Sequence, residues 1–190
     1  TGCFNSSGSF VSSCGQAYDG VVTLSSSHSF NFGKTAVSGE YSAIDTMEHE
    51  IDEILGGGGQ GSTLNGIANG EASPADRGVL DLYRYSAPGV ASFTTSGSAT
   101  SYFSVDGGNT DIVGFNQQSD GDYADFSTCD NVQSAFTCAG EAAPYDQSSP
   151  EYAMMESIGY DGVPEPASLA VLISGLAGLR VVRRRVPVAV

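Results

Sequence analysis

Hydrophobic residues recur at helical spacing in one stretch of the chain, between Tyr41 and Leu55. The apolar positions follow one another at steps of three and four residues: Ile44, Met47, Ile51, Ile54 and Leu55. This period is typical of an amphipathic helix. Four glycines, Gly56 to Gly59, follow directly and should end it. We therefore predict a helix over 41–55 whose apolar stripe packs on the core.

A second, shorter helix is predicted near the end of the folded part, over 150–158. Ser149 precedes Pro150 and offers an N-cap, while Gly159 is a residue that commonly ends a helix. In this helix Met154, Met155 and Ile158 should face the core.

Short runs of β-branched and aromatic residues predict strands between turn-forming residues. The predicted strands are 21–24, 30–32, 83–85, 90–94, 102–105 and 112–115. Asp106 to Asn109 should form a tight turn between the last two, because Gly and Asn tolerate positive φ. Residues 60–78 and 116–149 are predicted to be loops. The fold class is therefore α+β, with one folded domain ending near Tyr160.

The charges are unevenly distributed along the 190 residues. Before residue 167 there are 22 carboxylates and only three basic residues, so 3 − 22 gives a net charge of −19. Such a domain should repel phosphates, so we expect no nucleic acid partner. Acidic loops such as Asp106–Asp111 and Asp120–Asp125 could take up calcium, although neither has the full twelve-residue calcium-loop pattern.

The four cysteines fall into two local pairs, and neither pair has zinc-knuckle spacing. The simplest of the three possible connectivities joins Cys3 to Cys14 and Cys129 to Cys138. Disulfides of this kind indicate an oxidising compartment outside the cytoplasm. The chain opens at Thr1 without a signal-peptide pattern, so we expect either a fragment or a chain whose signal has been removed, and an N-terminal part of the domain could be missing.

The C-terminal segment has its own pattern. Val163-Pro164-Glu165-Pro166 is followed by uncharged residues from Ala167 to Leu179, and then by four arginines: Arg180, Arg183, Arg184 and Arg185. The apolar part, 167–182 at most, is slightly short for a membrane helix. If it inserts, the arginines should stay cytoplasmic. A buried core helix is the alternative, opposed by Gly175, Gly178 and the clustered arginines.

Residues 163–185 resemble the PEP-CTERM sorting signal of exported bacterial proteins. The resemblance implies that residues 162–190 form a transmembrane sorting segment behind a domain of residues 1–161. It also implies an exosortase-type sorting enzyme as partner and processing near Pro164, Glu165 and Pro166. The protein would then be exported, held at the cell envelope by its membrane segment, and finally released to the surface or the extracellular matrix.

The candidate chemistry lies on the predicted helix 41–55. His49 and Glu53 are four residues apart and share a helix face, so both can reach one ion, and Glu50 lies beside His49. This resembles the zincin motif His-Glu-x-x-His, in which two histidines bind zinc and the glutamate is the general base. Here Glu53 replaces the second histidine. A carboxylate also binds zinc, so the change alters the ligand set without forbidding the metal.

The third ligand is left open by the sequence. The longer metzincin pattern places a third histidine where this chain has Gly59. Asp81, Asp76 and His28 are candidates, as is a residue missing from the fragment. The alternative is a solvated acidic helix face. Against it, four carboxylates without a basic neighbour repel one another, and a bound cation would relieve that repulsion.

Three further segments, 81–86, 102–108 and 155–161, together with the helix resemble bacterial metzincin-like metalloproteases that often carry the same sorting tail. This resemblance covers roughly residues 41–161. It implies a zincin-like fold and a zinc metallopeptidase, with Glu50 as general base and a peptide or protein as substrate. Tyr83, Tyr85 and Tyr102 are candidate donors to the oxyanion, and no spacing selects one of them.

Two other functions compete with the peptidase. A non-catalytic surface or matrix protein of the same fold, with calcium in its acidic loops, fits the sorting tail equally well. A glycoside hydrolase would need two carboxyl groups facing across a cleft, and the sequence selects no such pair. The absence of Trp makes a sugar-stacking platform less favourable.

Overall fold

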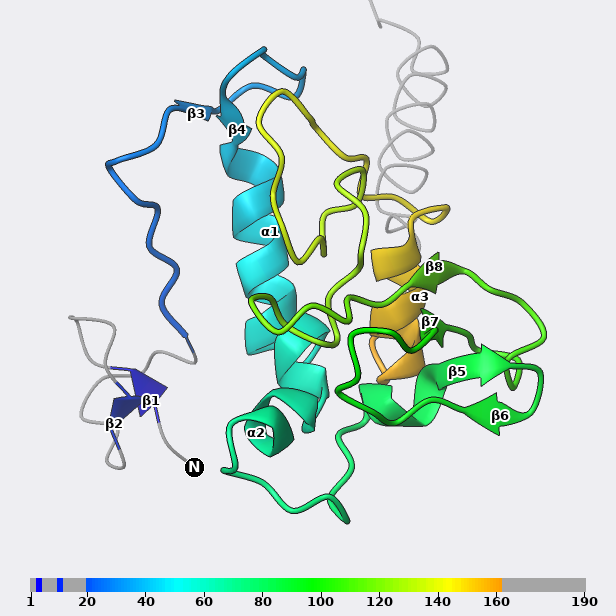
Figure 1. The fold of residues 1–190 in the computed structure, drawn as a ribbon. Coiled ribbons are helices and arrows are strands. Elements are labelled where there is room, and N and C mark those ends of the chain that lie inside the picture. The colour runs from blue at the N-terminus through cyan, green and yellow to red at the C-terminus, as the bar shows by residue number, and fades with distance from the viewer. Residues whose placement is uncertain (1–2, 5–9, 12–19, 162–190) are drawn as a thin grey trace, which may run out of the picture. The chain divides into compact units, whose positions relative to one another are not determined.

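The computed structural model describes residues 3–4, 10–11 and 20–161. The chain divides into two compact units, Thr1–Tyr160 and Asp161–Val190, and the fold described below is that of the first. It is a mixed α+β structure with three α-helices, two short 3-10 helices and small sheets (Figure 1). The predicted α+β class is confirmed. The predicted transmembrane sorting helix lies outside the described residues.

The longest helix, α1 (Ala43–Ile54), is the one predicted from the apolar spacing. Its N-cap is Ser42, whose side chain accepts a hydrogen bond from the Asp45 backbone N–H at 3.2 Å. It ends at Leu55, and Gly56 then takes a positive φ of 97° that only glycine adopts readily. The two residues before Ala43 form strand β4 (Tyr41–Ser42) instead of the first turn of the helix.

The prediction that the apolar stripe of α1 packs on the core is wrong. Met47, Ile51, Ile54 and Leu55 are each about two-fifths exposed, whereas Asp52 is only 3% exposed. The physical reason is that the inner side of the helix meets polar partners. Asp52, for example, accepts a hydrogen bond from the Tyr145 hydroxyl at 2.7 Å. The helix thus turns its acidic face inward.

A four-stranded antiparallel sheet forms the second structural layer, in the order β6-β5-β7-β8. Its strands are β6 (Val90–Ala91), β5 (Arg84–Ala87), β7 (Tyr102–Phe103) and β8 (Val113–Gly114). The four predicted strands here are confirmed, although β6, β7 and β8 are shorter than expected. Gly107 and Gly108 both have positive φ in the predicted turn between β7 and β8.

The hydrophobic core lies between this sheet and α3 (Pro150–Ser157), the second predicted helix. Its buried members are Leu80, Phe103, Phe115, Ala124, Phe126, Met154 and Met155. The Phe103 ring lies 6.0 Å from Phe115 and 6.4 Å from Phe126. Met154 and Met155 are buried as predicted, and Ile158 packs against them partly buried.

Two local predictions fail in the first half of the chain. Residues 21–24 form no strand, whereas β3 (Phe30–Asn31) pairs in parallel with β4. Residues 60–78 contain the 3-10 helix η1 (Gly58–Gly61) and helix α2 (Leu64–Ala68), followed by η2 (Leu80–Tyr83). The Asp81 carboxylate accepts hydrogen bonds at the start of α2, from the Thr63 backbone N–H at 3.0 Å and from Ser62 Oγ. This side-chain support, far away in sequence, stabilises a short helix that periodicity does not reveal.

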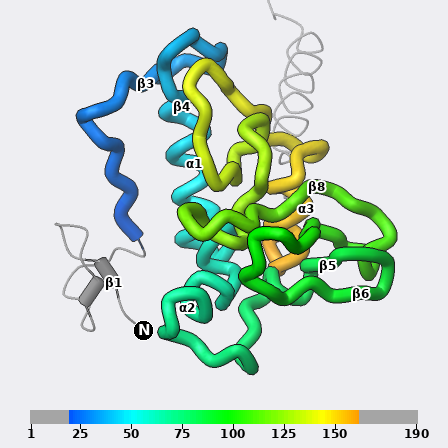
Figure 2. The backbone as a smooth tube through the Cα atoms, viewed as in Figure 1, coloured from blue at the N-terminus to red at the C-terminus, as the bar shows by residue number. Residues whose placement is uncertain are grey.

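The long segment 116–149 contains no helix or extended strand, and the predicted Cys129–Cys138 disulfide closes the loop 129–138 within it. The path of this segment across α1 can be followed in Figure 2. Strands β1 (Cys3–Phe4) and β2 (Phe10–Val11) pair antiparallel, but Cys14 lies outside the described residues, and so does the predicted Cys3–Cys14 bond. Within the described residues, no helix is both long and apolar enough to cross a membrane.

Candidate metal centre

His49 points from α1 toward the segment that the disulfide closes. Its Nδ1 lies 3.0 Å from the backbone carbonyl oxygen of Val132. In the tautomer with the proton on Nδ1, the ring donates to this carbonyl, and Nε2 accepts a hydrogen bond from the Gln133 amide, 3.2 Å away, which a bound metal ion would replace. A backbone carbonyl on the other ring nitrogen is the usual arrangement of a metal-binding histidine.

Two carboxylates lie near Nε2 of His49. Glu53 Oε1 lies 3.7 Å and Asp125 Oδ2 3.6 Å from this nitrogen, and one ligand atom from each residue lies within 4.8 Å of the others. Two atoms bound tetrahedrally to one zinc ion at about 2.0–2.2 Å lie roughly 3.3–3.6 Å apart. The two measured distances are close to that value, so the group could hold a metal ion with small side-chain adjustments.

The Gly-rich segment after α1 lets the backbone pass directly beside this group. A Cβ atom on Gly59 would lie 2.6 Å from Asp122 Oδ2 and 2.8 Å from Glu53 Oε1. The Gly59 backbone N–H, 3.2 Å from Glu53 Oε1, donates to the same carboxylate. Residue 59 therefore needs to be glycine so that the backbone can lie close to the carboxylates of Asp122 and Glu53. This steric requirement is stricter than that of ending the helix. At this position the carboxylate of Asp122, from another loop, lies beside that of Glu53.

Helix α2 and the sheet hold that loop, residues 120–125, in place. The Asn65 side-chain amide donates to Asp122, and its oxygen accepts from the Tyr123 backbone N–H at 3.0 Å. The buried Arg84 guanidinium of β5 donates to the Tyr123 carbonyl oxygen. These contacts on both sides fix the direction in which Asp125 points.

The carboxylates change the ionisation of one another and of His49. Burial alone would lower the pKa of His49, but its pairing with Glu53 and the negative charge of Asp125 outweigh this and raise the pKa to about 9. Burial raises the pKa of Asp125 to about 7, although His49 opposes the shift. The pKa of Asp122 is raised by burial and by Glu53. A bound cation would offset the negative charge of these buried carboxylates.

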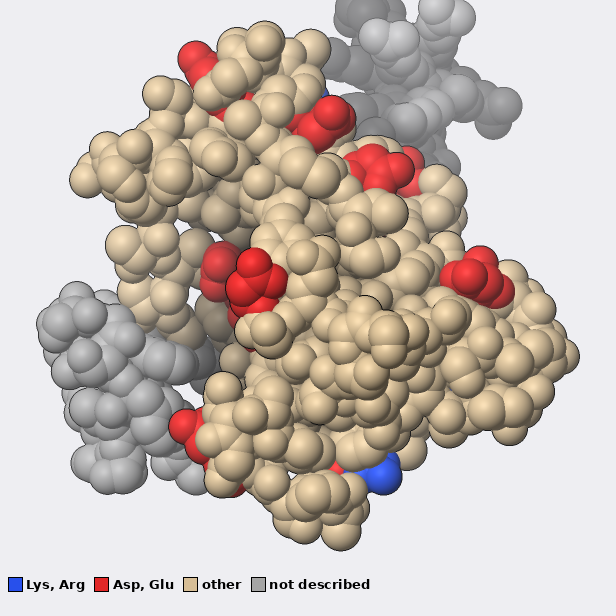
Figure 3. Space-filling model, in the orientation of Figure 1, with Lys and Arg blue, Asp and Glu red and all other residues tan. Residues whose placement is uncertain are grey.

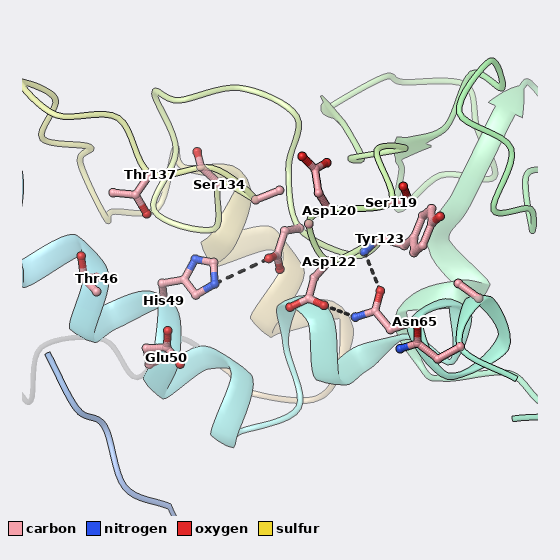
Figure 4. Close-up of a pocket in the computed structure, with 15 residues that line it drawn as sticks. Thr46, His49, Glu50, Asn65, Ser119, Asp120, Asp122, Tyr123, Ser134 and Thr137 are labelled. Atoms are coloured by element: carbon pink, nitrogen blue, oxygen red, sulfur yellow. Dashed lines mark hydrogen bonds and ion pairs between the residues drawn. The ribbon is translucent and has the colours of Figure 1, made fainter. Parts of the chain in front are cut away.

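A cleft of about 470 Å³ opens beside the group. It lies between α1, α2 and the loops 119–125 and 134–137, and its lining is mostly polar. Figure 4 shows His49 and Glu50 side by side on α1, with Asp122 opposite His49 and bonded to Asn65. Burial raises the pKa of Glu50, His49 lowers it, and Glu53 and Asp122 raise it further. In the described part of the chain, no Lys or Arg lines this cleft. The face drawn in Figure 3 likewise shows mainly acidic charges.

The structure brings three of the predicted site residues, His49, Glu50 and Glu53, to one place and leaves the candidate third ligands elsewhere. Asp81 is 5% exposed and is engaged by Ser62, Thr63 and Gly78, with the Gly78 N–H at 2.7 Å. Asp76 accepts from the Ser73 N–H, and the His28 ring lies against Tyr41 at 5.3 Å. None of the three belongs to the group around His49.

The candidate oxyanion donors are also engaged elsewhere. The Tyr83 hydroxyl donates to the Ser157 carbonyl at 2.8 Å, and the Tyr102 hydroxyl to the Gly108 carbonyl at 2.6 Å. The Tyr85 ring lies against Gly108, at the turn between β7 and β8. The tyrosine that lines the cleft is Tyr123, whose hydroxyl lies 3.3 Å from the Thr95 carbonyl.

Asp125 is the member of this candidate metal group that the sequence analysis does not identify as a ligand. It appears in the sequence only as the last carboxylate of the loop 120–125, considered there for calcium. The other candidate calcium loop is occupied internally, because Asp106 accepts from Ser104 and from both the hydroxyl and the N–H of Thr110. The sequence signal that points to Asp125 is the acidic cluster 120–125, which lies between polar turns and contains no basic residue.

Comparison of the chain with protein-family models, with curated proteins and with solved structures finds no match.

Proposed function

We propose that the chain is an exported zinc-dependent hydrolase of the metallopeptidase type, with the zinc ion held by His49, Glu53 and Asp125. The observation that carries the proposal is the orientation of α1. Its apolar stripe is exposed, whereas the His49 and Glu53 side chains are each only 15% exposed. Burying charged groups while exposing apolar ones destabilises a fold. A metal ion between these groups supplies the compensation.

The donor set supports zinc in this proposal. Imidazole nitrogen and carboxylate oxygen are both zinc ligands, and catalytic zinc sites use three protein ligands and keep a further position open. Calcium prefers six to eight oxygen ligands. When bound, zinc lowers the pKa of a water molecule and polarises a substrate carbonyl.

Glu50 supplies the proton transfer in this mechanism. Its carboxylate lines the cleft next to His49, and burial raises its pKa, which is the direction that strengthens a general base. Glu50 would accept the proton of the attacking water as the oxygen bonds to the carbonyl carbon. It would pass that proton to the amine nitrogen as the C–N bond breaks. Glu50 thus returns to its starting state.

Two features of the chain support a location outside the cytoplasm. The Cys129–Cys138 disulfide is typical of proteins outside the reducing cytoplasm. Combined with the resemblance of residues 163–185 to a sorting signal, it supports export, anchoring at the envelope by residues 167–182, and processing by an exosortase-type enzyme near Glu165. The substrate would then be an extracellular peptide or protein.

The test is to produce the full chain in an oxidising compartment and to measure zinc and calcium per chain by mass spectrometry. We expect about one zinc per chain, lost in His49→Ala and kept in the control His28→Ala. Casein or a peptide mixture should be cleaved, and Glu50→Gln should abolish cleavage while zinc stays bound, with Glu48→Gln as control. Zinc without cleavage would favour the non-catalytic surface protein, and a folded chain without zinc would refute the proposal.

A further inference from the structure

The side chain of Gln133 contacts two of the three candidate ligands. Its Nε2 lies 3.0 Å from Asp125 Oδ1 and 3.2 Å from His49 Nε2, and the residue is fully buried. Oε1 has no hydrogen-bond partner among the described residues. Within that part of the chain, the amide therefore makes hydrogen bonds only to the metal group.

Gln133 is held firmly in this position. Its backbone N–H donates to Glu151 Oε1 at 2.9 Å, and its carbonyl accepts from the Phe126 N–H at 2.7 Å. On the other side, a Cβ on Gly58 would lie only 2.1 Å from Gln133 Nε2, so the glycine backbone packs directly against the amide. The amide has little room to turn away from Asp125.

This contact makes the two oxygens of Asp125 unequal. Oδ1 accepts from Gln133, and Oδ2 is the oxygen near His49 Nε2. A carboxylate with one oxygen held in this way offers a metal ion the other oxygen only. Single oxygens at short distance suit four-coordinate zinc, whereas calcium collects many oxygens and often takes both from one carboxylate.

We propose that Gln133 is a positioning residue that restricts Asp125 to one metal-binding oxygen and thereby makes the site select zinc over calcium. The inference rests on the proposed zinc site and deepens it. A purely structural role explains the residue poorly, because Met would fill a similar volume without leaving a buried amide oxygen unpaired, which costs free energy.

The test compares Gln133→Met with the matched control Gln117→Met in the full chain. Gln117 also has buried amide atoms without partners in the described part of the chain, and it does not line the cleft. Zinc and calcium dissociation constants are measured by titration against chelators. The visible absorption of the Co²⁺-loaded chain reports coordination number, because tetrahedral Co²⁺ absorbs more strongly than five- or six-coordinate Co²⁺.

We expect Gln133→Met to weaken zinc binding by about 10–100-fold, the usual cost of losing an outer-shell partner. Calcium binding should be unchanged or tighter, and the cobalt absorption should weaken as Asp125 binds through both oxygens. Gln117→Met should change none of these. If the Met variant is not recovered folded, Gln133→Leu also removes the donor without adding a metal-binding oxygen, and it should shift the zinc-to-calcium ratio in the same direction.

Three results would overturn the inference, and they differ in what else they affect. Unchanged zinc affinity and an unchanged cobalt spectrum in Gln133→Met would remove the positioning role and leave the zinc site intact. An equal loss of zinc and calcium affinity would likewise reduce Gln133 to a packing residue. A wild-type chain that binds no zinc would overturn this inference and the proposed function together.

Discussion

His49 Nε2 and Asp125 Oδ2 lie 3.6 Å apart, although one residue belongs to α1 and the other to a loop far along the chain. Each is fixed from its own side. The Val132 carbonyl orients the ring, and Gln133 holds the other oxygen of Asp125. Two groups oriented in advance toward one point are what a metal site requires, because little ordering is left for the ion to impose.

Replacing Asp125 by Asn should weaken zinc binding by at least about 100-fold, more than is usual for a residue that only supports a ligand. The change keeps the shape and removes the charge. The matched control is Asp120→Asn, an exposed carboxylate of the same loop, which should leave the zinc dissociation constant within a factor of a few. Similar constants for both variants would mean that Asp125 is not a ligand.

Gly59→Ala should destabilise the fold by roughly 1–3 kcal/mol and weaken zinc binding, because the added Cβ pushes against Asp122 and Glu53. Gly97 is the control. Its nearest neighbour would lie 3.4 Å from an added Cβ, so Gly97→Ala should change the free energy of unfolding by less than about 0.5 kcal/mol. Urea unfolding with a chelator present measures the free energy of unfolding of both variants. Equal stabilities would contradict the close approach at Gly59.

Much of the fold could be predicted from local patterns. Both long helices, the four strands of the larger sheet and the Gly107–Gly108 turn follow from spacing and turn chemistry. The failures arise from distant contacts. Helix α2 depends on Asp81, and the orientation of α1 depends on polar partners such as Tyr145, which lie far away in sequence. Periodicity marks two faces of a helix but does not say which one the tertiary contacts bury.

The candidate site likewise has one part that a local pattern predicts and another that depends on distant contacts. His49, Glu50 and Glu53 could be selected because one helix turn places them together, and a motif describes that spacing. Asp125 and Gln133 lie on an irregular segment whose path is set by a disulfide, by Asn65 and by Arg84. No short-range pattern encodes such a path. In the sequence Gly59 indicates only the end of the helix and the absence of a third histidine, because its contribution is the space it leaves beside Asp122 and Glu53.

The inverted orientation of α1 gives a stability prediction. Ile51→Gln should change the free energy of unfolding by no more than about 0.5 kcal/mol, because Ile51 is 43% exposed. Met154→Ala, in contrast, removes a fully buried side chain and should cost about 2–5 kcal/mol. Urea unfolding of the two variants compares them. A loss of more than about 2 kcal/mol for Ile51→Gln would mean that the stripe is buried after all.

The Cys129–Cys138 disulfide should support metal binding as well as stability. It closes the segment that carries Val132 and Gln133, the residues that orient His49 and Asp125. The double variant Cys129→Ser, Cys138→Ser should lose about 2–4 kcal/mol of stability. It should also bind zinc more weakly, measured below its melting temperature. Unchanged zinc affinity in the folded variant would show that the ligands are positioned without the bond.

The metal-free chain should become less stable as the pH rises, and zinc should reverse that trend. Burial raises the pKa of Asp52 to about 6 and that of Asp125 to about 7, both from 3.8. The carboxylates around His49 overcome its burial and raise its pKa from 6.5 to about 9. In each case the folded state binds the proton more tightly than the unfolded state. The resulting stabilisation is complete below the unfolded pKa and is lost as the pH rises through the folded pKa.

The loss should therefore run from about pH 4 to 7 for the two aspartates and from about pH 6.5 to 9 for His49. Each pKa unit corresponds to ~1.4 kcal/mol, so a total loss of at least about 1 kcal/mol is expected. With zinc, the ligands must lose these protons, so added stability should grow over the same range. Urea unfolding at a series of pH values, with chelator or with zinc, measures the two curves of stability against pH. Asp125→Asn should flatten the acidic part of the curve measured with chelator. A metal-free chain that gains stability between about pH 5 and 9 would contradict this, because the carboxylates would then be ionised and paired without any ion.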